Sequence, residues 1–168
     1  MAQGKSDPIL DALSRVRRGL AAYLSYLTAC GMNQAFSEYV LYEPTLRILT
    51  AQRFIVRCEC ECPGIKRTGA GDKKRIDFVA TSRSNAIGSF ALEMKWSKKR
   101  AVDVTRDMKK LNLYRRANPS HAAYICVFGE KGDLEDIRLK PRGLRERGRA
   151  TYAGLGRTRY GCRTFQVV

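Results

Sequence analysis

The chain has 168 residues, 44% of them hydrophobic, which is the size and composition of one domain with a core of its own. It carries 32 Lys and Arg against 16 Asp and Glu, and the formal net charge of +16 favours a polyanionic partner, although a protein that binds nucleic acid only structurally fits equally well. No apolar run approaches the roughly 20 residues of a membrane span, and the N-terminus has no signal-peptide pattern, so we expect a cytoplasmic protein without membrane contact.

The first half of the chain predicts two helices. Asp7 and Pro8 form a helix start, with Asp7 as the N-cap, and apolar residues then recur at steps of three and four. We therefore expect an amphipathic helix over residues 8–30, whose apolar stripe serves as core or as a dimer surface. A second helical stretch covers residues 33–51, and Pro44 inside it is expected to kink the helix or to begin a new one.

The second half alternates strands with one helix and ends in a basic segment. Together the elements predict an α/β (α+β) fold, with a central mixed β-sheet of about four to five strands flanked by helices. We expect a single domain over residues 1–168, with its core at about 33–128 and with the helix 8–30 and the basic, loop-rich segment 138–168 outside that core. The expected elements are strands at 54–62, 73–80, 90–97, 122–128 and 164–168, and a helix at 103–117.

The six cysteines are expected to be buried, reduced thiols. No CxxC pair occurs, and the hydrophobic content is sufficient for a core without disulfides. Cys58, Cys60 and Cys62 alternate along one extended run, a spacing that suits tetrahedral zinc poorly. We expect these three residues to share one face of a strand with Phe54 and Val56.

The single histidine, His121, excludes mechanisms that need two or more, such as those of paired-histidine ribonucleases and HExxH metalloproteases. It follows Asn118, Pro119 and Ser120, which places it at the junction of a loop and a strand. A lone histidine in such a place is typically a partner in a local hydrogen bond.

The residues most informative about function lie on two successive predicted strands, KKRIDFVA at 73–80 and FALEMKWS at 90–97. Side chains alternate along a strand, so Glu93 and Lys95 share one face of the second strand, and their burial is costly without compensation. A divalent cation bound by Glu93 and Asp77, with Lys95 beside it, supplies that compensation and indicates metal-dependent phosphodiester chemistry. The alternative is a solvent-facing pair on an edge strand, with Asp77 an unrelated surface acid.

This pattern resembles that of the PD-(D/E)XK nuclease superfamily, whose members have the restriction-endonuclease-like fold. The resemblance rests on Asp77 in Arg75-Ile76-Asp77-Phe78, fifteen intervening residues and then Glu93-Met94-Lys95, with an acidic helix upstream and an amphipathic helix downstream. It covers about residues 33–128. The proline that gives the family its name is absent, because Ile76 precedes Asp77.

The resemblance implies a metal-dependent active site. Asp77 and Glu93 would bind Mg²⁺ or Mn²⁺, with the backbone carbonyl of Met94 as a further ligand, because hard oxygen ligands suit these ions. Lys95 would orient or help deprotonate the attacking water and offset charge in the transition state. The implied activity is hydrolysis of phosphodiester bonds in DNA by an endonuclease, and cleavage of both strands would require a homodimer.

Members of the family often carry a glutamate on the helix that precedes the first strand. Glu38 and Glu43 both lie on the predicted helix. We prefer Glu43 as the catalytic glutamate, because it begins the helical turn at 44–49 and precedes the strand at the usual distance, with Glu38 as the alternative.

Clusters of basic residues suggest where nucleic acid binds. Arginine binds phosphates, and interleaved tyrosines such as Tyr152 and Tyr160 can stack on bases, although such charges also form solvated surfaces. A non-catalytic nucleic-acid-binding module is the rival function, and an RNA-directed nuclease or toxin effector would share the chemistry. For Lys110, which shares a helix side with Asp107 and Tyr114, an exposed helix face is the alternative. The predicted nucleic-acid contacts are Lys98, Lys99, Arg100, Lys110, Arg142, Arg145, Arg147, Arg149, Arg157 and Arg159.

Overall fold

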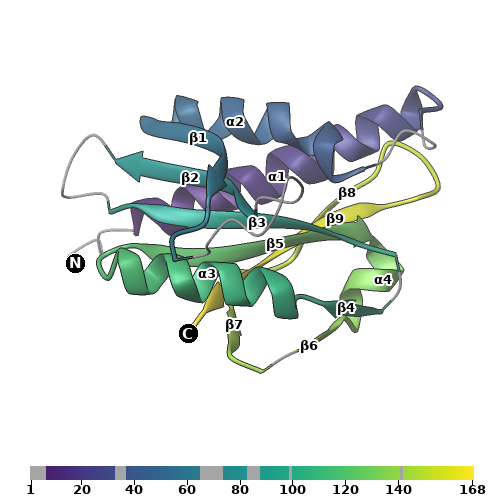
Figure 1. Cartoon of the computed structure of the whole chain (residues 1–168). Coiled ribbons are helices and arrows are strands. Elements are labelled where there is room, and N and C mark those ends of the chain that lie inside the picture. The colour runs from purple at the N-terminus through teal and green to yellow at the C-terminus, as the bar shows by residue number, and fades with distance from the viewer. Residues whose placement is uncertain (1–6, 33–36, 65–73, 83–87, 99, 141) are drawn as a thin grey trace, which may run out of the picture.

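The computed structural model describes residues 7–32, 37–64, 74–82, 88–98, 100–140 and 142–168. Within these ranges the chain forms an α+β fold in which one mixed β-sheet is covered by helices on both faces (Figure 1). In the same ranges, no helix combines the length and the apolar character needed to cross a bilayer.

Helix α1 (Pro8–Ala29) begins where the sequence predicts. Asp7 Oδ1 accepts a hydrogen bond from the Ile9 N–H at 2.9 Å, and Pro8 lies in the first turn, where no helical N–H is required. After the last turn, Gly31 adopts a φ of 73°, in the left-handed region that favours glycine.

The second predicted helix is divided in two. The short 3₁₀ helix η2 (Glu38–Leu41) leads directly into α2 (Tyr42–Ala51), so Pro44 lies in the first turn of a new helix. A proline is tolerated there, because the first N–H groups of a helix have no partner within it. The beginning of this predicted helix, at residues 33–36, lies outside the described residues.

The main sheet has seven strands, more than the four to five expected. Its order is β1-β2-β3-β5-β9-β7, with β8 paired to β9, and β3 and β5 are its parallel neighbours. A separate two-stranded sheet joins β4 and β6. The strands are β1 (Phe54–Glu61), β2 (Arg75–Ser82), β3 (Phe90–Ser97), β4 (Ala101–Asp103), β5 (Ala122–Glu130), β6 (Arg138–Lys140), β7 (Leu144–Glu146), β8 (Thr151–Ala153) and β9 (Tyr160–Val167).

The basic C-terminal segment belongs to the sheet and is not the loop-rich extension that was expected. Strand β9 begins at Tyr160 rather than at Thr164 and runs antiparallel to β5. Strands β6, β7 and β8 have three residues each, too few to show a strand pattern in the sequence. A short helix, α4 (Lys131–Glu135), precedes them and was also not predicted.

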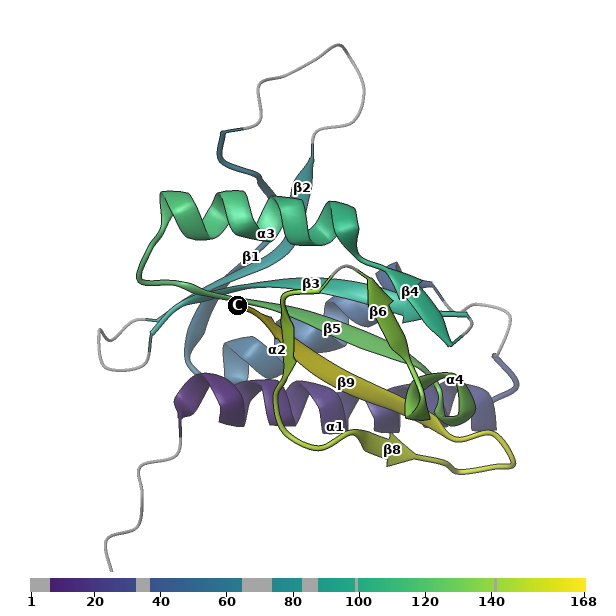
Figure 2. The ribbon, with the colours of Figure 1, turned by 90° about the horizontal axis from the view of Figure 1, so that it is seen from below.

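Two apolar layers hold the helices to the sheet. Helices α1 and α2 pack on one face, against Leu92 and Met94 of β3, whereas α3 (Thr105–Ala117) packs on the other face, against Ala91 (Figure 2). Leu13 and Leu20 of α1 are fully buried. The apolar stripe of α1 is therefore core and not a dimer surface.

Strand β1 changes face part-way along its length, so the prediction that its alternate residues share one face is wrong. Phe54 and Val56 pack in the layer of α1 and α2, whereas Cys60 and Cys62 pack in the layer of α3. The change occurs at Glu59, which adopts a left-handed φ of 52° and is skipped in the pairing with β2, although the register is the same before and after it.

The cysteine prediction holds only in part. Cys62, Cys126 and Cys162 are buried, as expected for apolar-like thiols. Cys30 and Cys58 are exposed, because Cys30 follows the end of α1 and Cys58 directly precedes the change of face at Glu59.

Candidate active site

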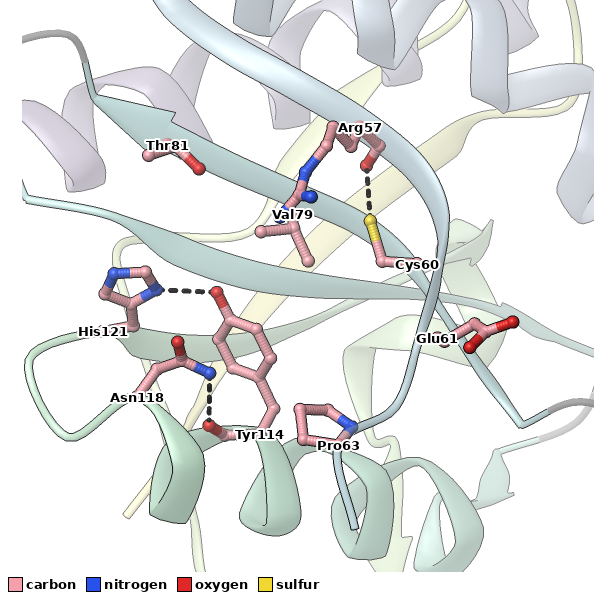
Figure 3. Close-up of a pocket in the computed structure, with 9 residues that line it drawn as sticks. All are labelled: Arg57, Cys60, Glu61, Pro63, Val79, Thr81, Tyr114, Asn118 and His121. Carbon is pink, nitrogen blue, oxygen red and sulfur yellow. Dashed lines mark hydrogen bonds between the residues drawn. The ribbon is translucent and has the colours of Figure 1, made fainter. Parts of the chain in front are cut away.

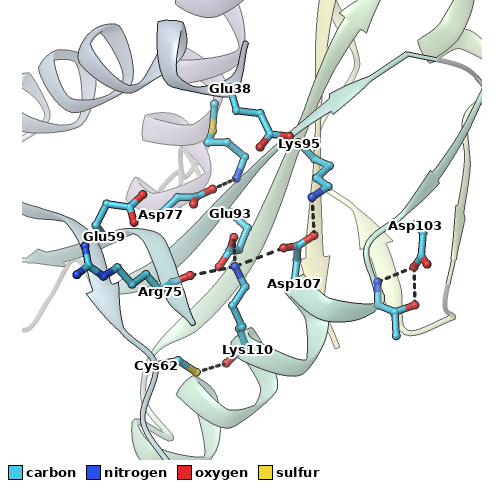
Figure 4. A network of polar contacts seen from close by, with 12 residues as sticks. Glu38, Glu59, Cys62, Arg75, Asp77, Glu93, Lys95, Asp103, Asp107 and Lys110 are labelled. Carbon is cyan, nitrogen blue, oxygen red and sulfur yellow. Dashed lines mark hydrogen bonds and ion pairs between the residues drawn. The ribbon is translucent and has the colours of Figure 1, made fainter. Parts of the chain in front are cut away.

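Asp77 and Glu93 lie at neighbouring positions, where strands β2 and β3 stop pairing. The antiparallel register pairs Phe78 with Leu92, and the two acids are the next residues along the two strands. Asp77 Oδ2 accepts a hydrogen bond from the Met94 N–H at 2.7 Å, which ties the carboxylate of one strand to the backbone of the other (Figure 4). The structure therefore brings the two predicted acids together.

The Glu93 carboxyl group is buried and only half satisfied. The residue is 2% exposed, and its Oε2 accepts a hydrogen bond from Lys110 Nζ at 2.7 Å. Its Oε1 is buried and has no hydrogen-bond partner in the described part of the chain. Burial, with repulsion from Asp77, raises the pKa of Glu93 to about 9, although Lys110 acts in the opposite direction. A further cation beside Oε1 would favour the charged carboxylate.

Tyr42, in the first turn of α2, contacts Asp77 from the other side. Its hydroxyl donates a hydrogen bond to Asp77 Oδ1 at 2.7 Å and lies 3.0 Å from Glu59 Oε1. The hydroxyl has a single proton and can donate it to only one carboxylate at a time. Because the same hydroxyl contacts both carboxylates, Glu59 is a third acid, after Asp77 and Glu93, at this place. Burial raises the pKa of Asp77, whereas the hydrogen bonds from Tyr42 and from the Met94 N–H lower it.

Lys95 points to the same side of the sheet as Glu93 and pairs with a residue of α3. Its Nζ lies 3.3 Å from Asp107 Oδ2, while the other oxygen of Asp107 lies 3.4 Å from Lys110 Nζ. Burial alone would lower the pKa of Lys95, but the carboxylates of Asp107 and Glu38 outweigh it and raise the pKa, so the amine stays protonated. We call the following residues the acid–lysine cluster: Asp77, Glu93, Lys95, Asp107 and Lys110.

Glu38, rather than the preferred Glu43, is the helix glutamate that lies against β3. Glu38 Oε1 accepts a hydrogen bond from the Trp96 N–H at 3.0 Å, and its charge acts on Lys95. Glu43 lies on the exposed side of α2 and pairs with Arg47. Distance along the sequence cannot reveal which of the two side chains turns toward the sheet.

The predicted nucleic-acid contacts do not form one surface. Lys110 lies inside the acid–lysine cluster, and Arg147 is held in the fold, because its Nε donates to Gln166 Oε1 at 2.7 Å. Lys99 lies outside the described residues. The predicted contacts that are exposed are Lys98, Arg100, Arg142, Arg145, Arg149, Arg157 and Arg159.

Asp107, Tyr42 and Glu59 were not predicted as part of the site. Asp107 and Lys110 are three residues apart on one helix, so the spacing that favours an ion pair was already visible in the sequence. Tyr42 and Glu59 carry no comparable signal. They reach Asp77 only because α2 begins and β1 changes face beside it.

The residues present fit a hard divalent cation. Within the described ranges, no three His, Cys, Asp or Glu side chains are arranged as ligands of one metal. Mg²⁺, however, is usually held by one or two carboxylates and keeps several waters. Asp77 and the unpartnered Oε1 of Glu93 supply two such carboxylates. The carbonyl of Met94 as a further ligand stays a prediction.

No family model, curated protein or solved structure matches the chain. A functional conclusion therefore depends on the residues of the acid–lysine cluster and on their contacts.

Proposed function

We propose that this protein is a metal-dependent nuclease of the PD-(D/E)XK type that hydrolyses phosphodiester bonds in DNA. One observation carries the proposal: Asp77 and the buried, half-satisfied Glu93 meet where β2 and β3 separate, with Lys95 on the same side of the sheet. When bound between these carboxylates, Mg²⁺ or Mn²⁺ would act as a Lewis acid and make a bound water nucleophilic at neutral pH.

The protein side chains supply orientation and charge. Tyr42 and the Met94 N–H each occupy one oxygen of Asp77 and fix the carboxylate. Lys95, kept protonated by its acidic neighbours, would offset the charge that develops on the phosphate in the transition state. Asp107 holds the Lys95 ammonium in place and acts as a positioning residue.

The charge of the protein supports a nucleic-acid substrate. The net charge of +16 attracts a polyanion to a site whose own acids would otherwise repel it. We propose DNA as the target and cleavage within the strand.

Incubation with supercoiled, linear and single-stranded DNA and with RNA, each with Mg²⁺, with Mn²⁺ and with chelator, tests the proposal. We expect metal-dependent nicking of closed circular DNA, which has no ends and so reports internal cleavage. Cleavage of RNA alone would correct the substrate, and the absence of metal-dependent cleavage of any substrate would favour a binding module.

Matched variants separate catalysis from folding. We expect Asp77→Asn and Lys95→Ala each to lower the cleavage rate at least about 100-fold, because each removes a group that acts on the transition state, while DNA binding is retained. Asp11→Asn, an exposed acid of α1 paired with Arg15, is the control and should cleave normally. Equal rates for Asp77→Asn and the parent protein would contradict the assignment.

A further inference from the structure

A pocket of about 360 Å³ lies beside the acid–lysine cluster, between the outer strands and the C-terminal half of α3 (Figure 3). Its volume is within the range of about 300–1,000 Å³ that is typical of ligand sites. The residues that line this pocket do not include any member of the acid–lysine cluster. Arg57, Val79 and Thr81 line it from the strands, and Tyr114, Asn118 and His121 line it from the helix and the turn that follows.

The helix side of the pocket presents a fixed imidazole. The Tyr114 hydroxyl and His121 Nδ1 are 2.6 Å apart, which holds the ring and leaves Nε2 without a partner in the described structure. Asn118 Nδ2 donates to the Tyr114 carbonyl at 3.0 Å, so the amide oxygen of Asn118 is the atom left to accept a hydrogen bond. The helix side therefore offers a flat ring and polar atoms at its edge.

The strand side of the pocket is mixed in character. Val79 is apolar and buried, and it lies opposite Arg57 in the β1–β2 register, so both side chains are on the α3 face. Neither the Arg57 guanidinium nor the Thr81 hydroxyl forms a side-chain hydrogen bond or an ion pair with the described residues. Glu61 also lines this pocket, with its carboxylate turned away from the other lining side chains (Figure 3).

The pocket is adjacent to the proposed catalytic residues on both of its sides. Cys60 in its wall is paired across the strands with Ile76, the residue before Asp77. On α3, Tyr114 lies one helical turn, about 5.4 Å, beyond Lys110. An unstacked strand extends further per nucleotide than the about 3.4 Å of a duplex strand, so the pocket lies within one or two nucleotides of the site.

We propose that this pocket binds one unpaired nucleobase of the substrate, next to the phosphodiester that is cleaved. The inference rests on the proposed nuclease function and specifies its substrate. A base can stack on the face of His121 and form edge hydrogen bonds with Asn118, Thr81 and Arg57, whereas an intact duplex keeps its bases stacked and out of reach. The preferred substrate is therefore single-stranded or locally unpaired nucleic acid.

Because His121 is the single histidine of the chain, its ring signals in an NMR spectrum report on this pocket alone. We would titrate histidine-labelled protein, in chelator, with deoxyadenosine, with dAMP and with inorganic phosphate. Saturable shifts of the His121 signals with deoxyadenosine and dAMP, and none with phosphate, are expected. Equal shifts with phosphate and dAMP and none with the nucleoside, or no shift with any probe, would overturn the base pocket.

Cleavage kinetics give the second test. His121→Ala and Arg57→Gln are expected to raise KM for a single-stranded oligonucleotide about 5- to 150-fold with little change in kcat, the range for loss of one stacked base. Arg47→Gln, an exposed arginine of α2, is the charge-matched control.

The two proposals fail separately. Cleavage by the parent protein without any shift of the His121 signals overturns the pocket and leaves the nuclease. His121 shifts without metal-dependent cleavage overturn the nuclease and leave a base-binding site.

Discussion

Lys110 supplies the positive charge beside the buried carboxylates of Glu93 and Asp107. Its Nζ donates to Glu93 Oε2 at 2.7 Å and to the Arg75 carbonyl at 2.9 Å, and it lies 3.4 Å from Asp107 Oδ1. Burial disfavours the charged amine, but the carboxylates of Glu93 and Asp107 outweigh it and raise the pKa of Lys110. The ammonium is therefore a cation built into the acid–lysine cluster itself.

Replacement of this ammonium tests that role. Lys110→Met leaves Glu93 Oε2 buried without its donor, so we expect the free energy of unfolding in chelator to fall by about 1–3 kcal/mol. Mg²⁺ should then restore more stability in the variant than it adds to the parent, because the ion takes over the lost charge. Urea denaturation with Mg²⁺ and with chelator measures both effects. Lys109→Met, at the exposed neighbouring position, is the control, and an equal loss there would contradict the role of Lys110.

At the scale of single elements, the sequence predicts strands best where a long apolar pattern is continuous. Strands β2, β3 and β5 are found close to their predicted bounds, and with them Asp77, Glu93 and Lys95. The pattern fails at β9, because Gly161 and Arg163 interrupt the apolar pattern at the start of a strand that pairs on both of its edges. It fails too for Glu38, whose contact with β3 depends on its place in the separate 3₁₀ helix η2.

Strand β1 shows why local alternation is an incomplete guide. At Glu59 the backbone has a φ of 52°, so the alternate side chains that follow it pack on the opposite face of the sheet from those that precede it. The same turn brings the Glu59 carboxylate to Tyr42. Left-handed backbone costs an ordinary residue roughly 1–2 kcal/mol, and nothing in the pattern of the sequence announces it. The strained residue lies directly beside the proposed site, where strain is often concentrated.

The strain at Glu59 predicts an unusual order of stabilities. Glu59→Gly and Glu59→Ala both lose the carboxylate, but only glycine adopts a positive φ without strain, so the glycine variant should be more stable by about 1 kcal/mol. At Glu61, in the same strand and with ordinary φ, the order should reverse, because glycine weakens a strand. Thermal or urea unfolding of the four variants measures this. Alanine more stable than glycine at both positions would contradict the left-handed turn.

At the scale of the whole molecule, two of the exposed cations, Lys98 and Arg159, lie at the same end of the sheet. Ser97 of β3 is in register with Gly129 of β5, which pairs with Gly161 of β9. Lys98 and Arg159 each lie just beyond these strand ends, and both are exposed. On the proposed function, a nucleic-acid chain that passes the acid–lysine cluster along β3 would meet these two positive charges beyond the strand ends.

This arrangement predicts which arginines contact phosphate. Because β6 to β9 belong to the fold, deletion of the basic segment would unfold it, and point substitutions are the proper test. Arg157→Gln with Arg159→Gln, both exposed in the β8–β9 connection, should reduce the slope of log affinity against log salt by about 1.4 for a single strand, about 0.7 for each lost contact. Fluorescence anisotropy of a labelled oligonucleotide in chelator, across a series of salt concentrations, gives the slope.

The charge-matched control combines Arg18→Gln with Arg47→Gln on the exposed sides of α1 and α2. An equal reduction in the control would mean that net charge alone attracts the substrate, whereas a reduction confined to Arg157 and Arg159 would place the phosphate path at the carboxyl end of β3.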